Sequence, residues 1–189
     1  MTKRHLQIVV PLLIVALVVG LWFVKNHQAT ADPVFTAADK AALPEHLQTA
    51  DFSLTAEGAI DYAALSAYGL PLLIDYSSER CAPCQRMAPE LQAVNSDVYG
   101  KAFVKVVNLD AYPEAAKDVP VLVYPTQIFV NADGTPFEPS AELQEKYHFA
   151  MYTDKESGAL AYTTHQGALT AAQMQEILTE MGVDAAWTP

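Results

Sequence analysis

Residues Leu70 to Leu91, LPLLIDYSSERCAPCQRMAPEL, contain the only two cysteines of this 189-residue chain. The run begins with closely spaced leucines and an isoleucine and has no helical caps, which predicts a short buried strand. Good helix formers follow the second cysteine, so we expect a helix whose first turn holds both sulfurs. Unpaired N–H groups and the positive end of the helix dipole would favour a thiolate at that position.

A CxxC pair can be a redox pair, half of a zinc site or a structural disulfide. Structural zinc sites usually have four ligands, but the chain has no second CxxC, and His46, His148 and His165 are scattered. A permanent disulfide that closes so small a loop would restrict the unfolded chain only slightly. The pattern therefore favours reversible oxidation. It predicts no metal site and no cofactor, since no nucleotide-binding glycine motif is present.

Further along the chain, three other features accompany Cys81-Ala82-Pro83-Cys84. Asp75 lies six residues before Cys81, Tyr124-Pro125-Thr126 precedes an apolar run, and Gly167 precedes a helical segment. In this order, from Ala59 to about Met174, the sequence resembles the thioredoxin family. The resemblance implies an α/β fold of thioredoxin type, with a central mixed β-sheet flanked by helices.

The same resemblance implies roles for individual residues. Cys81 would be the nucleophile, Cys84 would resolve the mixed disulfide, and Asp75 would accept the proton of Cys84 through water. Asp75 could instead be a satisfied carboxylate at the end of a strand. A cis Pro125 would present a strand edge to the substrate. The substrate groove would be formed by Ala82, Pro83, Tyr124, Pro125 and Gly167.

The N-terminal segment predicts a membrane anchor. A basic head, Met1–His5, precedes the uncharged apolar run Leu6–Val24. At about 1.5 Å per residue, this run nearly matches a hydrocarbon core of about 30 Å. Ala29-Thr30-Ala31 could alternatively be the cleavage site of a signal peptide. The positive charges before the run place the N-terminus in the cytoplasm and the rest of the chain outside, periplasmic or extracellular.

The charge of the exported part excludes one class of partner. Residues 32–189 contain all 22 acidic and eight of the eleven basic residues, so their formal net charge is −14. Nucleic acid is therefore not expected as a partner. Disulfides persist outside the cytoplasm, and an exported chain with one closely spaced cysteine pair is typical of a catalytic dithiol.

The sequence predicts three parts. Residues 1–31 form the head, the anchor and the start of a tether, residues 32–57 a linker and lead-in to the domain, and residues 58–189 the thioredoxin-like domain. Further elements of this domain are expected from capping residues and β-rich runs. They are a helix over Asp61–Gly69, a strand over Ala102–Asp110 parallel to the first, a strand over Tyr124–Val130, and a final helix from Thr170 to about Met181.

An insertion at about 135–165 exceeds what a simple hairpin needs. Tyr147–Thr153 and Ala159–His165 flank a turn-forming sequence and predict an extended β-hairpin. The insertion is either an elaborated edge of the sheet or a docking surface for a partner.

The direction of electron flow depends on the residues around the cysteines. The Ala-Pro dipeptide resembles the reducing end of the family, whereas Ser77 and Arg80 replace its two tryptophans. A cation beside Cys81 would favour the thiolate and an oxidising pair. Arg80 could instead be solvated, or could pair with Glu79 or Glu90.

These observations predict a membrane-anchored, extracytoplasmic thiol–disulfide oxidoreductase that reduces disulfides in exported proteins. The resemblance implies that an integral membrane electron-transfer protein recharges it, and cytochrome c maturation is one possible destination. One alternative is a disulfide oxidase or isomerase on the same fold. Another is a binding module or metal chaperone that uses the two thiols.

Overall fold

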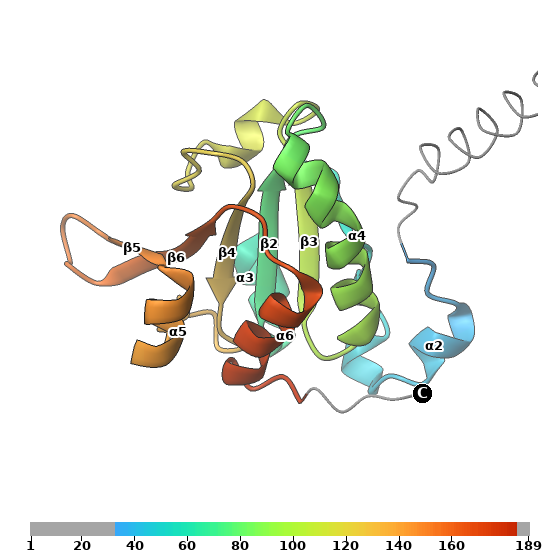
Figure 1. Ribbon diagram of the computed structural model, residues 1–189. Helices are drawn as coiled ribbons and strands as arrows, with labels where there is room; N and C mark the ends of the chain where they lie inside the picture. The colour runs from blue at the N-terminus through green and yellow to red at the C-terminus, as the bar shows by residue number, and fades with distance from the viewer. Residues whose placement is uncertain (1–32, 185–189) are drawn as a thin grey trace, which may run out of the picture. The chain divides into compact units, whose positions relative to one another are not determined.

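The computed structural model describes residues 33–184, which contain one mixed sheet with the strand order β1-β3-β2-β4-β6-β5 (Figure 1). β2 is parallel to β3 and antiparallel to β4, and β6 is antiparallel to both β4 and β5. The strands are β1 Thr55–Ala56, β2 Leu72–Ser77, β3 Phe103–Asn108, β4 Thr126–Val130, β5 Ala150–Thr153 and β6 Leu160–Gln166. The helices are α2 Ala37–Ala41, η1 Glu45–Leu47, α3 Tyr62–Ser66, α4 Ala82–Asp97, η2 Pro113–Ala116, α5 Ala141–Tyr147 and α6 Ala171–Glu180.

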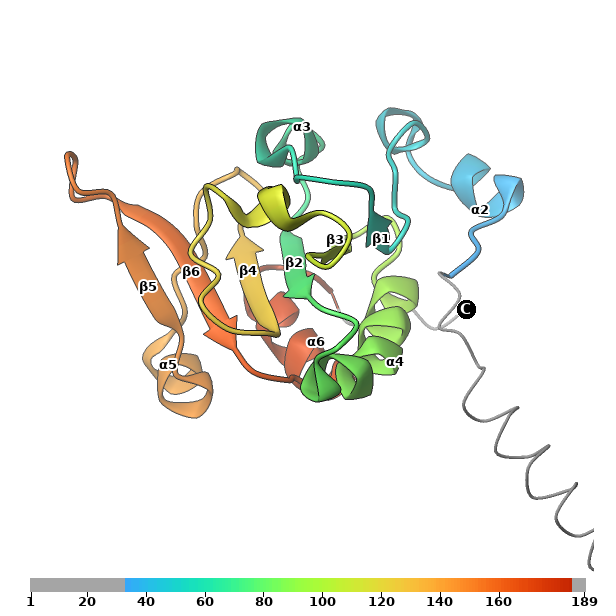
Figure 2. The same cartoon turned by 90° about the horizontal axis from the view of Figure 1, so that it is seen from above.

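Helices cover both faces of the sheet, with α4 and α6 on one face and α3 on the other (Figure 2). The central strand β2 serves both layers because its side chains alternate between the faces. Leu73 packs with the α4 and α6 side chains, whereas Leu72, Ile74 and Tyr76 belong to the opposite core. The predicted strand is therefore present, and all of its residues from Leu72 to Tyr76 are buried.

The helix after the cysteines begins where the sequence predicts it. Cys81 is the N-cap of α4, and Pro83 occupies the first turn, where a missing N–H costs nothing. Met87, Leu91 and Val94 follow at helical spacing and are buried against the sheet. The same turn that starts the helix thus places the cysteines at the end of β2.

The described part of the predicted linker and lead-in, residues 33–57, contributes a strand to the sheet. β1 pairs with β3 in parallel, and residues 33–57 belong to the same compact unit as the rest of the sheet. Burial of apolar side chains holds this segment, because four of them lie in the core. They are Leu47, Ala50, Phe52 and Leu54. Residues 43–57 are consequently part of the domain.

The insertion contains a helix that the sequence analysis did not predict. α5 precedes the β5–β6 hairpin, and Ser140 caps it by accepting a hydrogen bond from Leu143 N. Tyr147 therefore ends α5, and the strand begins at Ala150, later than predicted. His148 makes the change of direction with a left-handed backbone, φ 52°. The hairpin itself lies where the sequence predicts it.

In the region from 33 to 184, no helix has the length and apolar character needed to cross a membrane. The predicted anchor over residues 6–24 and the alternative cleavage site at residues 29–31 lie outside the described residues.

Candidate active site

The two cysteines form a disulfide across the first turn of α4. Their Cα atoms are 5.2 Å apart, and Cys84 N donates a hydrogen bond to Cys81 Sγ over 3.2 Å. Cys84 is only 4% exposed, whereas Cys81 is partly accessible. The first sulfur is thus the one that a macromolecular substrate can reach.

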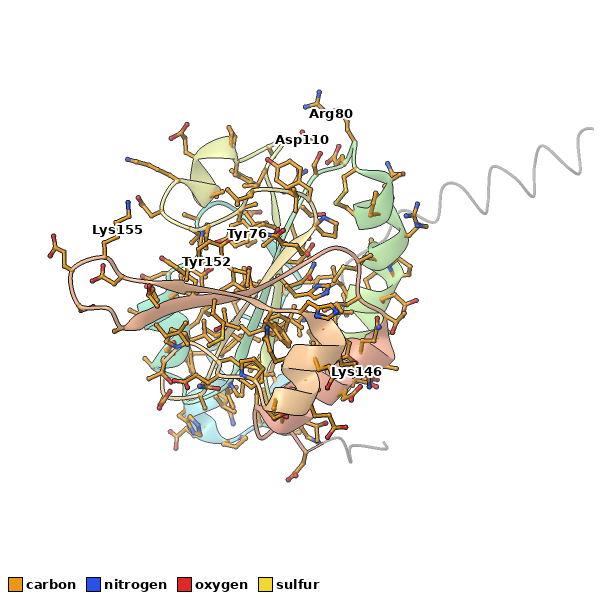
Figure 3. All side chains as sticks on the ribbon, turned by 60° about the vertical axis from the view of Figure 1, so that its left-hand side comes forward. Tyr76, Arg80, Asp110, Lys146, Tyr152 and Lys155 are labelled. Atoms are coloured by element: carbon orange, nitrogen blue, oxygen red, sulfur yellow. A yellow bond between two sulfur atoms is a disulfide. The ribbon has the colours of Figure 1, made fainter. Side chains whose placement is uncertain are left out.

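The loop before the cysteines is held by one carboxylate. Asp110 accepts hydrogen bonds from Ser78 Oγ over 2.8 Å and from Glu79 N over 2.9 Å. It also forms an ion pair with Arg80 over 2.7 Å, and Figure 3 shows the two side chains close together. The Arg80 guanidinium, with help from Ser78, lowers the pKa of Asp110 to about 2.

The pairing of Arg80 corrects the partners considered from the sequence. Glu79 accepts a hydrogen bond from Asn108, and Glu90 accepts one from Ala171 N, so neither is the partner of Arg80. The Arg80 side chain is 85% exposed and its charge is balanced by Asp110. A fixed, uncompensated cation beside Cys81 is therefore absent from this side of the site, within the residues described.

Pro125 lies at the same end of the sheet as the cysteines. The Tyr124–Pro125 bond is cis. Because Tyr76 pairs with Thr126, the start of β4 lies beside the end of β2 that leads to Cys81. Gly167 N donates to Pro125 O over 2.9 Å and so joins the end of β6 to this turn.

The residues predicted for a substrate groove differ in accessibility. Ala82 and Tyr124 are exposed, Pro83 and Gly167 are partly exposed, and Pro125 is buried. The sequence analysis missed two exposed apolar side chains beside them, Leu122 at 74% and Val123 at 48% exposure. Their signal was weak, because isolated apolar residues in a loop do not by themselves indicate a surface.

Asp75 lies in the middle of the sheet and is fully buried. Burial raises its pKa to about 7, and interactions with Gln127 and Ser77 oppose this rise. Oδ1 accepts a hydrogen bond from Gln127 Nε2 over 2.8 Å, while Oδ2 is buried and has no hydrogen-bond partner of acceptable geometry among the described residues. A carboxyl group with this pKa can take up and release a proton near neutral pH.

The position of Asp75 relative to Cys84 follows from Met87. Gln127 Nε2, which binds Asp75, also lies 3.5 Å from Met87 Sδ. Cys84 and Met87 are three residues apart on α4 and both are buried, so they face the sheet together. Asp75 therefore lies against the first turns of α4, on the side to which Cys84 points.

Gln127 and His165 are polar residues of this region to which the sequence analysis assigned no role. Gln127 Oε1 lies 2.8 Å from His165 Nδ1. Burial lowers the pKa of His165, and a hydrogen bond with the Gly167 backbone opposes that effect. A glutamine in the apolar run after Pro125 was a usable signal, but its partners could not be identified without the strand register.

Across residues 33–184, no group of three or more His, Cys, Asp and Glu side chains is arranged to hold a metal ion.

Comparison with known proteins found similar proteins by sequence and by structure. The thioredoxin family model matches residues 63–155. The thioredoxin of Staphylococcus aureus strain Mu50 is 34% identical over 83 residues, which cover 44% of this chain and 79% of that protein. Fasciola hepatica thioredoxin matches with 20% identity and a TM-score of 0.47, over 68% of this chain and 98% of that chain. Malassezia sympodialis thioredoxin matches with 17% identity and a TM-score of 0.47, over 68% of this chain and 90% of that chain.

Proposed function

Because the chain belongs to the thioredoxin family and is a thiol–disulfide oxidoreductase with a Cys81–Cys84 pair, we propose that it reduces disulfides of exported proteins outside the cytoplasm. The accessible Cys81 sulfur at the start of α4, with Cys84 buried behind it, is the observation that carries this proposal. It gives the two sulfurs different tasks in a reaction with a protein substrate.

The reaction has two exchange steps. In the first, the Cys81 thiolate attacks a substrate disulfide, a mixed disulfide forms, and one substrate sulfur leaves as a thiolate. In the second, Cys84 loses its proton and attacks Cys81 Sγ, and the other substrate sulfur leaves. The substrate gains two electrons, and the Cys81–Cys84 disulfide forms. The N-terminal N–H groups of α4 stabilise the attacking Cys81 thiolate.

Asp75 is proposed as the acceptor of the Cys84 proton in the second step. Its pKa of about 7 suits a base that works near neutral pH, and Oδ2 is free of hydrogen bonds to other described residues. The buried carboxyl group lies against the helix that carries Cys84, and transfer through one water molecule is compatible with that placement.

Recognition of substrate is proposed to involve the cis-proline turn. Pro125 has no backbone N–H, and the neighbouring edge can accept an extended peptide beside Cys81. The groove is formed by Ala82, Pro83, Tyr124, Pro125 and Gly167. Leu122 and Val123 extend it with exposed apolar surface, which suits disulfides in partly unfolded chains.

Electron flow toward substrate is supported by the Arg80–Asp110 ion pair. An unpaired cation next to Cys81 would stabilise the thiolate and make the pair more oxidising. Asp110 balances this charge, and the exposed guanidinium is also screened by solvent. The Ala-Pro dipeptide between the cysteines favours the same direction.

Location and recharging are proposed from the sequence. The basic head and the apolar run at 6–24 support a single membrane span with the cysteine domain outside. In that compartment an integral membrane electron-transfer protein would reduce the Cys81–Cys84 disulfide. Supply of reduced cysteines for cytochrome c maturation is one use of such a pathway.

The test is the equilibrium redox potential of the full-length protein in detergent micelles, measured by thiol trapping in glutathione and dithiothreitol buffers. A value at or below about −220 mV supports a reductase, and a value between about −120 and −160 mV makes the protein an oxidase or isomerase instead. Cys84→Ser should trap substrates on Cys81, and Cys81→Ser is the matched control that should trap none. Zinc titration with and without reductant tests the alternative of a thiol-based metal-binding module.

A further inference from the structure

Three polar side chains form a row across the sheet beside the first turns of α4. Asp75, Gln127 and His165 are register partners on the adjacent strands β2, β4 and β6. Register partners point to the same face of a sheet, so the backbone pairing itself aligns the row. Two contacts of 2.8 Å join the three side chains into one hydrogen-bonded chain.

The ends of the row determine how the Gln127 amide is oriented. An ionised Asp75 only accepts hydrogen bonds, so the amide NH₂ must face it and the carbonyl Oε1 must face His165. His165 Nδ1 must then carry a proton and donate it to Oε1. Met87 Sδ, a weak acceptor 3.5 Å from Nε2, is compatible with the same orientation.

We propose that Gln127 and His165 are positioning residues for the exchange reaction. His165 holds the Gln127 amide, and Gln127 in turn holds the Asp75 carboxylate with Oδ1 occupied and Oδ2 open to the Cys84 proton. The functional part of this inference rests on the role proposed above for Asp75. Its structural part, the effect of Gln127 and His165 on the Asp75 pKa, can be measured independently of that role.

Among the described residues, few other groups around Asp75 can stabilise its ionised carboxylate. Its partner on β3 is Val106, which is apolar, and Met87 of α4 lies 3.5 Å from the Gln127 amide that binds it. Within the described part of the chain, the Asp75 pKa is lowered by the hydrogen bond from Gln127 and by the neighbouring Ser77 side chain, with no contribution from a charged side chain. Loss of the Gln127 amide would thus remove a principal support of the ionised form.

The other end of the row lies at a pocket of about 410 Å³. The Tyr147 and Phe149 rings pack edge-on against the His165 ring at centroid distances of 6.5 and 6.3 Å. Besides His165, the ionisable side chains of the pocket are Lys146, Tyr147 and His148, and Lys146 is paired with Glu176 of α6.

The experiment measures the pKa of Asp75 in the reduced full-length protein by carboxyl ¹³C NMR, together with the pH dependence of the resolution step. Gln127→Leu should raise the Asp75 pKa by about 1–2 units, since a hydrogen bond to a charged group is removed. His165→Leu should raise it in the same direction. His165→Gln keeps an N–H donor without a titratable ring, and should leave the Asp75 pKa close to that of the unaltered protein.

Thr163→Val is the matched control. Thr163 is buried on β6 and its Oγ1 donates to Phe137 O, so this variant loses a buried hydrogen bond outside the row. It should lower the free energy of unfolding and leave the Asp75 pKa unchanged. If Gln127→Leu does not fold, the two His165 variants decide the question.

An unchanged Asp75 pKa in Gln127→Leu and His165→Leu overturns the inference, as does a His165→Gln variant that behaves like His165→Leu. If the pKa rises and the rising limb of the resolution rate moves to higher pH with it, both proposals are supported. If the pKa rises while the rate profile stays in place, the row positions Asp75 but the proposed role of Asp75 as proton acceptor is wrong.

Discussion

Lys105 Nζ lies 2.8 Å from Asp51 Oδ2, and this ion pair binds the central sheet to the segment before β1. The Lys105 side chain is 4% exposed, whereas that of Asp51 is 71% exposed. Lys105 also donates to Ser53 O over 2.7 Å. A buried cation on β3 thus depends on groups from the segment that the sequence analysis predicted as a linker and lead-in.

The two members of this pair should respond unequally to substitution. Asp51→Asn leaves a buried ammonium group with one charge partner fewer, and should lower the free energy of unfolding by about 1 kcal/mol, since the exposed carboxylate is partly screened. Lys105→Met removes the buried charge and leaves Asp51 in water, so it should lower the free energy of unfolding by less than Asp51→Asn does. Urea unfolding at pH 7 of both variants measures the difference, and a larger loss for Lys105→Met would contradict this account.

The pH dependence gives a second check of the pair. The hydrogen bonds from Lys105 and Ser53 lower the pKa of Asp51 against the opposing effect of burial. A lowered pKa contributes stability that is present above the unfolded value and is lost as the pH falls through the folded value. Asp51→Asn should therefore lose less stability than the unaltered protein when unfolding is compared between pH 6 and pH 3.

Folding of the domain should require the segment before β1. A fragment of residues 33–189 retains Leu47, Phe52 and Leu54, whereas one of residues 58–189 loses these buried side chains and β1. Burial of each large apolar side chain contributes about 1.5–3 kcal/mol, which together approaches the whole stability of a domain. The shorter fragment should show no cooperative thermal transition by circular dichroism. A sharp transition for both fragments would mean that residues 33–57 are dispensable.

Asp75→Asn should stabilise the protein at alkaline pH. The folded pKa of about 7 lies above the reference value of 3.8, so the folded state binds the proton more tightly and loses relative stability as the pH rises between these values. Over that pH range, the free energy of unfolding of Asp75→Asn should rise relative to that of the unaltered protein by about 3–4 kcal/mol. Guanidinium unfolding at pH 4 and pH 8 measures it.

The control for this prediction is Asp118→Asn, which neutralises an exposed carboxylate. It should show no comparable gain between the two pH values. If the free energy of unfolding of Asp75→Asn differs from that of the unaltered protein by the same amount at pH 4 and at pH 8, the Asp75 pKa is not raised by burial.

Arg80→Gln should change the redox potential only slightly. Arg80 is exposed and already paired with Asp110, and such surface pairs contribute up to about 1 kcal/mol, which corresponds to about 20 mV for a two-electron couple. Equilibration with glutathione, with the exposed Arg86→Gln on α4 as a control, measures the change. A fall of more than about 50 mV in Arg80→Gln alone would show that Arg80 acts directly on the Cys81 thiolate.

Most of the framework could be predicted from local patterns. The apolar run before Cys81 predicted β2, and Thr170 followed by Gln173 predicted the capping box that starts α6. The predictions failed where the local sequence was ambiguous. α5 follows two prolines and is only one to two turns long. The apolar side chains of residues 43–57 show no clear period, and they become buried only by packing against β3 and, for Leu54, against α4.

The candidate site divides in the same way. The cysteines could be found because they are close in sequence and lie at one strand-to-helix turn, a local arrangement that the chain specifies over a few residues. The partner of Arg80 could not, since Asp110 is 30 residues away and was one of several acidic candidates. The same holds for Leu122 and Val123, whose exposure depends on how their loop packs.

The sequence by itself determined the cysteine pair, the strand and helix that carry it, and the family resemblance, because these depend on residues that are neighbours in the chain. Only the tertiary structure decided the environment of Asp75. Its hydrogen-bond partner Gln127 is 52 residues away, and His165 lies another 38 residues beyond. Strand register across β2, β4 and β6 brings the three together, and burial in that sheet raises the pKa of the carboxyl group.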